Sequence, residues 1–281
     1  MASNPVFNRI EREAEQGYAG FRDRGPQPPQ PAAPAPSWGQ PTMSDQQLQE
    51  MYNQPPASAV QAGRVTLDDV VMKTAGLFVL LLVFAGLGWA LAPQFGPVIV
   101  LGGIALTLVL GLVIAFKKTV SVPLIVGYAV VEGLLVGAVS AVYADFYEGI
   151  VTQAVLATLS VFAGMLLAYK VGLIKVTDKF RRIMTMAIMG YAIFAVVNLG
   201  YALITNTPFG FGGTGALGIG ISVFAVGLAS LSLAVDFDSI ERAIAAGAPQ
   251  KYSWLLAHGL IVTLVWLYLE ILRLLGRLRS E

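Results

Sequence analysis

Glu132 places a carboxylate in the middle of an otherwise apolar segment, residues 120–142. A charged side chain inside a lipid bilayer is energetically costly, so such residues usually serve a proton or ion pathway. One interpretation is that Glu132 takes up and releases a proton during transport or pH sensing. The alternative is structural: a glutamic acid that stays protonated and makes one hydrogen bond to a neighbouring helix. Gly133 and Gly137 form a small-xxx-small pair beside it, which lets another helix approach closely.

Two more carboxylates, Asp236 and Asp238, end another apolar segment. Acidic side chains at a helix C-terminus oppose the helix dipole, so helix stability does not explain them. Arg242 follows Asp238 at the i+4 position and could pair with it on a solvated helix end. Equally, the two aspartates could form the mouth of a pathway that attracts cations, with Arg242 and Lys251 as a latch over the carboxylates.

The last apolar segment carries the polar side chains His258, Thr263, Glu270 and Arg273. Glu270 and Arg273 are three residues apart and can pair on one helix face, which favours a structural role. His258 is the single histidine of the chain. A lone histidine at a membrane boundary is more typical of a hydrogen-bonding helix residue than of a ligand, although it could titrate near neutral pH.

Residue types exclude several classes of chemistry. The chain has no cysteine and one histidine, which rules out disulfides, thiolate catalysis and a multi-histidine metal site within one chain. The glycine pattern at 213–218 follows no strand, so a dinucleotide site is not expected there. No nucleophile–base pair is visible, and a net charge of +1 gives no reason to expect nucleic-acid binding. We therefore expect neither an enzyme nor a bound cofactor.

These residues are positioned by a very apolar chain, with 56% hydrophobic and 12% charged residues among 281. A soluble domain carries about 25% charged residues, so the composition indicates an integral membrane protein whose first partner is the lipid bilayer. A helix needs about 20 apolar residues to cross the hydrocarbon core. The sequence thus predicts an all-α bundle of seven transmembrane helices, at residues 72–92, 97–116, 120–142, 150–169, 183–204, 215–235 and 254–274.

The chain is expected to divide into a tail at 1–64, the transmembrane domain at 65–276 and a short basic C-terminus at 277–281. The tail is rich in Pro, Gln and Ala, and nine of the fifteen prolines lie between positions 26 and 56. Such a composition cannot bury a core and predicts a disordered cytoplasmic tail. Thr66, with Asp69 three residues later, is typical of a helix start.

Lysine and arginine are distributed unevenly among the joints between the predicted helices. Three joints contain neither residue: 93–96, 143–149 and 205–214. By the positive-inside rule the basic joints lie in the cytoplasm, which predicts a multi-pass protein of the cell (cytoplasmic) membrane with a cytoplasmic N-terminus. Arg273, Arg277 and Arg279 fall on the outer side if the seventh segment spans fully. We favour that over a re-entrant element because the apolar length of the segment suffices.

Three short motifs occur in order on the predicted helices: Val131–Leu134 in the third, Phe237–Ser239 at the end of the sixth and Leu267–Gly276 in the seventh. Together they resemble the Bax inhibitor family, the transmembrane Bax-inhibitor-motif proteins. Asn4–Arg9 and Thr66–Thr74 look like a prokaryotic branch of it. The resemblance implies a seven-helix membrane protein that leaks Ca²⁺ down its gradient and responds to pH.

In that family two aspartates face each other near the cytosolic side, one ending the sixth helix and one within the seventh. Such a pair shares a proton, and when both ionise they offer an oxygen-rich site suited to Ca²⁺. The resemblance places the first aspartate at Asp238, or alternatively at Asp236, and the glutamate of the third helix at Glu132. Thr263 stands where the second aspartate is expected, and it cannot ionise. Asp236 could replace it only if the helix breaks at Phe237, because residues two apart point to different sides.

We therefore expect a pH-sensitive Ca²⁺ leak in which Glu132 titrates within the membrane. Asp236 and Asp238 would form the inner mouth and supply the Ca²⁺ ligands. The alternative is a non-conducting membrane interaction protein that restrains a membrane-protein partner, such as a membrane protease or a stress-response complex. The proline-rich tail and the small-residue helix faces would suit that role.

Overall fold

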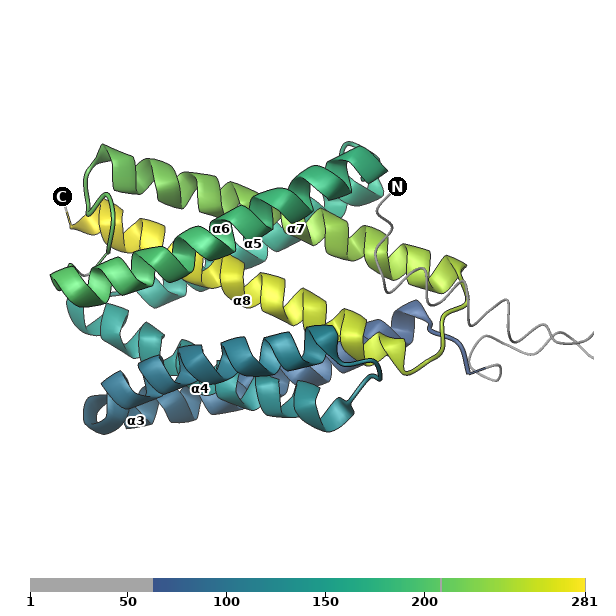
Figure 1. Cartoon of the computed structure of the whole chain (residues 1–281), viewed down its shortest axis with the longest axis horizontal. Helices are drawn as coiled ribbons and strands as arrows, with labels where there is room; N and C mark the ends of the chain where they lie inside the picture. The colour runs from purple at the N-terminus through teal and green to yellow at the C-terminus, as the bar shows by residue number, and fades with distance from the viewer. Residues whose placement is uncertain (1–62, 208, 281) are drawn as a thin grey trace, which may run out of the picture. The chain divides into compact units, whose positions relative to one another are not determined.

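The computed structural model describes residues 63–207 and 209–280, and most of them are helical. Figure 1 shows the helices of this part of the chain, whose labels are kept here. They are α3 (Leu67–Phe116), α4 (Val122–Phe146), α5 (Ile150–Lys170), α6 (Asp178–Thr205), α7 (Ala216–Ala245) and α8 (Tyr252–Arg279). All six are long and apolar enough to cross a membrane. Within the described residues the only β-structure is one isolated bridge, so the predicted all-helical membrane protein is confirmed.

The predicted disordered tail, residues 1–64, lies outside the described residues apart from its last two positions. Arg64 forms the isolated bridge with Pro249, and the amide of Val65 donates to the carbonyl of Ala248 at 2.8 Å. These backbone contacts tie the start of α3 to the α7–α8 connection.

Helix α3 contains two of the predicted segments, 72–92 and 97–116, so seven separate helices are not confirmed. It has 50 residues and includes Pro93 and Pro97. A straight helix of that length would extend about 75 Å, far beyond a hydrocarbon core of about 30 Å. Proline bends helices because it lacks an amide hydrogen and its ring clashes with the preceding turn. In Figure 1, α3 runs out along the bundle and returns.

Contacts with α4 show that the two halves of α3 run in opposite directions. In the first half, Leu81 lies against Gly133, Ala85 against Gly137 and Gly88 against Leu134, whereas in the second half Gly103 lies against Leu135 and Gly111 against Tyr128. From Leu81 to Ala85 the contact moves forward along α4, and from Gly103 to Gly111 it moves backward. The glycines at these contacts allow the backbones to meet closely, as the small-residue spacing on α4 predicts.

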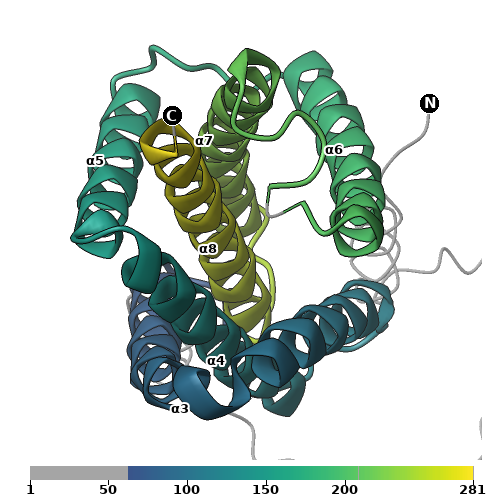
Figure 2. The ribbon, with the colours of Figure 1, turned by 90° about the vertical axis from the view of Figure 1, so that its left-hand side faces the viewer.

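Helix α8 lies at the centre of the bundle, as the end-on view in Figure 2 shows. It contacts α3, α4, α5 and α7, and half of its 28 residues are buried. The helix is continuous, and its two ends lie at opposite ends of the bundle (Figure 1). Helix α6 is more peripheral, since its backbone comes close to that of α7 alone among the described helices and it meets α8 through side chains. Several polar side chains of α8, among them His258, Thr263 and Glu270, are thus buried inside the protein.

Candidate functional site

Asp236 lies near the end of α7 and turns its side chain toward α8. Its carboxyl group interacts with the hydroxyl of Thr263. That hydroxyl also donates to the carbonyl of Gly259 at 3.2 Å. The Oδ2 atom of Asp236 is buried and has no hydrogen-bond partner. A buried carboxylate in this situation is stabilised by taking up a proton or by binding a cation.

Asp238, two residues further on, has different partners. Its Oδ2 atom accepts a hydrogen bond from Arg181 of α6 and a second from Nε of Arg242 at 2.9 Å. Arg242 reaches further, to the carboxylate of Asp178 at 3.4 Å and the carbonyl of Val176 at 3.5 Å. The predicted pairing of Arg242 with Asp238 is therefore present, and it belongs to a cluster that ties α6 to α7.

The two aspartates do not form one site. Helix α7 continues without a break through Phe237, so residues two apart point to nearly opposite sides. Asp236 faces α8, whereas Asp238 faces α6. In the structure, Asp236 is therefore the aspartate that lies next to Thr263. The resemblance had named Asp238 as the first choice for that position and Asp236 as the alternative. Within the described ranges, no group of three or more His, Cys, Asp and Glu side chains is close enough to hold a metal ion.

Glu132 is buried in α4, with 7% of its surface exposed. The hydroxyl of Tyr128, one turn earlier on the same helix, is its hydrogen-bonding neighbour. The ring of Tyr128 packs edge-on against His258 of α8, with 4.6 Å between ring centres. Helix α4 contacts α8 but makes no contact with α7 among the described helices. Glu132 therefore lies apart from the aspartates, next to Tyr128 and His258.

Lys251, the second predicted latch residue, does not reach the aspartates. It is exposed just before α8 and lines a shallow pocket with Asp69, Lys73 and Trp254. Within the described part of the chain, the cations paired with Asp238 are Arg181 and Arg242. Arg181 was not predicted, because nothing in its basic stretch, 170–182, distinguishes it from its neighbours.

Glu270 forms the polar contact between α6 and α8. Tyr191 of α6 donates to its Oε1 at 2.6 Å, and Trp266 donates to the same atom at 3.3 Å. Arg273 pairs with it at 3.0 Å, as the i,i+3 spacing predicts. The partner that sequence reasoning missed is Tyr191, which is 79 residues away. All of these groups fix the position of α6 against the central helix.

Arg277 belongs to α8 and is 1% exposed. Its guanidinium donates to the carbonyls of Gly218 and Phe209, the second at 2.9 Å, and to the hydroxyl of Ser222 at 3.1 Å. These acceptors lie at the start of α7 and in the connection before it. These hydrogen bonds offset the cost of burying the guanidinium.

Three polar side chains of α8 meet α6 or α7: Thr263 meets Asp236, Glu270 meets Tyr191 and Arg277 meets Ser222. These contacts are called the polar seam. On α8 its members recur every seven residues, at 263, 270 and 277, which places them on one helix face. A seam of charged and hydroxyl groups through apolar spans is the arrangement expected of a proton or ion pathway. The periodicity on α8 was visible in the sequence, but the partners on α6 and α7 were not.

Comparison with known proteins assigns the chain to a family. A family model described as Bax inhibitor 1 like matches residues 4–280. A search among curated proteins returned no match. The family match covers almost the whole chain, including the motifs around Glu132, Asp238 and Arg273 that carry the resemblance in the sequence. This multi-pass membrane protein therefore belongs to the Bax inhibitor 1 like family.

Proposed function

We propose that the chain crosses the cell membrane seven times, with α3 supplying two spans and the N-terminal tail in the cytoplasm. The opposite directions of the two halves of α3 support this count. The continuous course of α8 supports a full last span. The end of the bundle that holds residue 64 also holds the basic connections between α5 and α6 and between α7 and α8 (Figure 1), which is the distribution expected of a cytoplasmic side.

We further propose that the protein is a pH-sensitive cation leak, with Ca²⁺ as the cargo. The observation that carries this proposal is the buried, unpartnered Oδ2 of Asp236 on the polar seam. At low pH a proton neutralises this carboxyl group and removes the attraction for cations. At higher pH the ionised group attracts a hard cation, for which carboxylate and hydroxyl oxygens are suitable ligands. Ca²⁺ flux should therefore rise with pH.

The contacts of Asp238 supply a gate for this leak. Arg181 and Arg242 hold Asp238 at the cytoplasmic end of α7, immediately beyond Asp236. While these pairs are intact, they hold α6 against the end of α7, and the two arginines add positive charge that disfavours an entering cation. Release of the pairs would loosen α6, whose further polar ties include Asp178 with Arg242 and Tyr191 with Glu270. The proposed conducting state is one in which α6 has moved away from α7.

Glu132 has a separate part in this proposal. It lies on the other side of α8, and its proton exchange would act on the α4–α8 contact through Tyr128 and His258. We predict that Glu132→Gln, which keeps the shape but cannot ionise, reduces the change in flux with pH without abolishing conduction. Equal flux for wild type and Glu132→Gln at every pH would remove Glu132 from the mechanism.

The test is Ca²⁺ uptake into liposomes that contain the purified protein and a Ca²⁺-sensitive dye, between about pH 6 and about pH 8. Liposomes without protein are the control. We expect uptake above this control that increases with pH. Uptake equal to that of the empty liposomes throughout would contradict the leak and favour the alternative, a non-conducting membrane protein that restrains a partner.

A further inference from the structure

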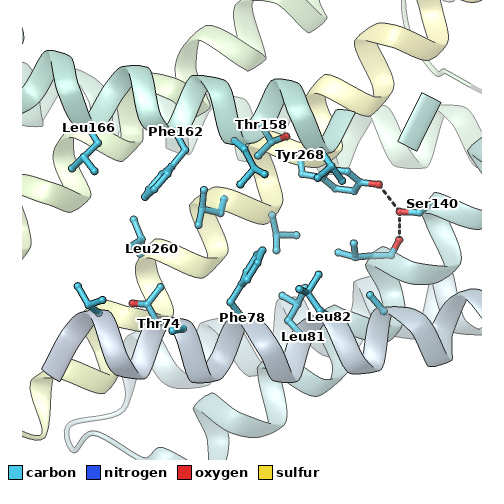
Figure 3. Close-up of a pocket in the computed structure, with 18 of the residues that line it drawn as sticks. Thr74, Phe78, Leu81, Leu82, Ser140, Thr158, Phe162, Leu166, Leu260 and Tyr268 are labelled. Atoms are coloured by element: carbon cyan, nitrogen blue, oxygen red, sulfur yellow. Dashed lines mark hydrogen bonds between the residues drawn. The ribbon is translucent and has the colours of Figure 1, made fainter. Parts of the chain in front are cut away.

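A second feature of the bundle lies away from the polar seam. A cavity of about 790 Å³ is bounded by the first half of α3 on one side and by α5 on the other. Figure 3 shows its floor, which is formed by α8 with side chains of α4 at one end. Neither Glu132 nor Asp236 lines it. The cavity is therefore distinct from the groups proposed to conduct ions.

The cavity opens sideways, toward the surroundings of the bundle. Its floor is buried and includes Leu260 and Val265 of the central helix. Its rim is exposed and includes Leu82 of α3 and Val155 of α5. Helices α3 and α5 do not contact each other in the described structure. Since both cross the membrane, the gap between them faces the hydrocarbon core of the bilayer.

The cavity wall is almost wholly apolar, and most of its few polar groups are already satisfied. Thr158 donates to the carbonyl of Ala154 at 2.7 Å, and Ser140 shares a hydrogen bond with Tyr268 at 2.7 Å. The exception is Thr74, whose buried hydroxyl has no hydrogen-bond partner and lies on the cavity side of α3 (Figure 3). The lining thus fits a hydrocarbon chain.

Water is a poor occupant of such a space, because an apolar cavity offers it too few hydrogen bonds. An empty cavity of this size would forfeit dispersion contacts along its whole wall.

We propose that this cavity binds one acyl chain of a membrane phospholipid, which enters sideways between α3 and α5. The chain lies along Leu260 and Val265 of α8. Phe237, between the two aspartates of α7, also lines the cavity. The bound chain therefore packs against Phe237, next to the contact between α7 and α8. The proposal requires only that the helices cross a membrane, and it is independent of ion conduction.

The experiment is photolabelling of the full-length protein in liposomes. The probe is a phosphatidylcholine with a diazirine in the middle of one acyl chain, and the labelled positions are mapped by proteolysis and mass spectrometry. We expect label on Leu260–Val265, a stretch of the central helix that bulk lipid does not reach. Label confined to lipid-facing positions such as Val196 and Val197 would overturn the proposal and leave water, a partner helix or a second copy as the occupant.

Two matched pairs of variants test whether the label on α8 comes from a lipid chain inside the cavity. Thr158→Phe fills the cavity, whereas Ser160→Phe adds the same ring to an exposed position on the same helix. We expect Thr158→Phe to reduce label on α8 at least about fivefold, which is a change of about 1 kcal/mol, and Ser160→Phe to leave it unchanged. If Thr158→Phe does not fold, Gly86→Leu at the rim replaces it, with Gly76→Leu as control, because an added side chain has space at both glycines. Undiminished label on α8 in the folded cavity variant would contradict the assignment.

Discussion

Replacing Gly137 with alanine is expected to prevent stable packing of α3 on α4. A methyl group at this position would overlap the carbonyl oxygen of Ala85 and lie 2.8 Å from the amide nitrogen of Trp89. Both are backbone atoms of α3, so no side-chain rotation can relieve the overlap. The backbone of α3 is also held at Gly88, which lies against the carbonyl of Leu134. Overpacking usually costs about 1–3 kcal/mol, and a clash between two backbones should lie at or above the top of that range.

Gly127→Ala is the matched control for this prediction, because it adds the same methyl group to the same helix. Nothing lies within 4 Å of a Cβ atom at Gly127. Alanine should stabilise the helix there by up to about 1 kcal/mol, since glycine loses more backbone entropy on folding. The measurement is thermal unfolding in detergent, with size-exclusion chromatography to detect aggregation. Equal melting temperatures for the two variants would show that the α3–α4 contact is not as close as described.

Replacing Arg181 with glutamine is expected to increase Ca²⁺ leak about tenfold. Arg181 and Asp238 are largely buried, with 22% and 13% of their side chains exposed. A hydrogen bond between charged groups contributes about 1.5–3 kcal/mol, and loss of 1.4 kcal/mol from a closed state changes its ratio to the open state about tenfold. The loss also removes one of the two positive charges beside Asp238. Both effects favour cation entry from the cytoplasmic end.

Arg182→Gln removes an identical charge from the next residue, which is exposed, and it should leave the flux close to that of wild type. This control separates the pairing with Asp238 from a general loss of positive charge. A merely structural role for Arg181 would lower the melting temperature of Arg181→Gln and leave Ca²⁺ flux unchanged. That outcome would contradict the gate while leaving the fold intact.

Local features of the fold could be predicted from the sequence because they depend on neighbouring residues. The start of α3 is an example: the Thr66 hydroxyl accepts a hydrogen bond from the amide of Asp69 at 3.2 Å, as their spacing predicts. The apolar segments gave the positions of the helices, and the ion pair of Glu270 with Arg273 followed from their i,i+3 spacing. The merging of two segments into α3 could not be predicted, because proline is compatible with both a loop and a bent helix.

The candidate site was predictable in its residue types but not in its pairings. The resemblance identified the end of α7 and the position of Thr263. It named Asp238 as the first choice for the aspartate opposite Thr263, whereas in the structure Asp236 lies there. Two positions along a helix correspond to about 200° of rotation, so the choice depends on how α7 packs against α8. The link from Arg181 to Asp238 spans 57 residues and depends on that same packing. No local spacing in the sequence contains this information.

The central claim is that Asp236 makes a cation leak sensitive to pH, and the most direct measurement is the Ca²⁺ flux of Asp236→Asn in liposomes at about pH 6 and about pH 8. Asparagine keeps the shape of the side chain but can neither ionise nor release a proton. Asp145→Asn makes the same change at an exposed acid near the end of α4 and serves as the control. We predict that wild type and Asp145→Asn leak several-fold faster at the higher pH, whereas Asp236→Asn leaks slowly and equally at both. A wild-type response to pH in Asp236→Asn would contradict the proposal.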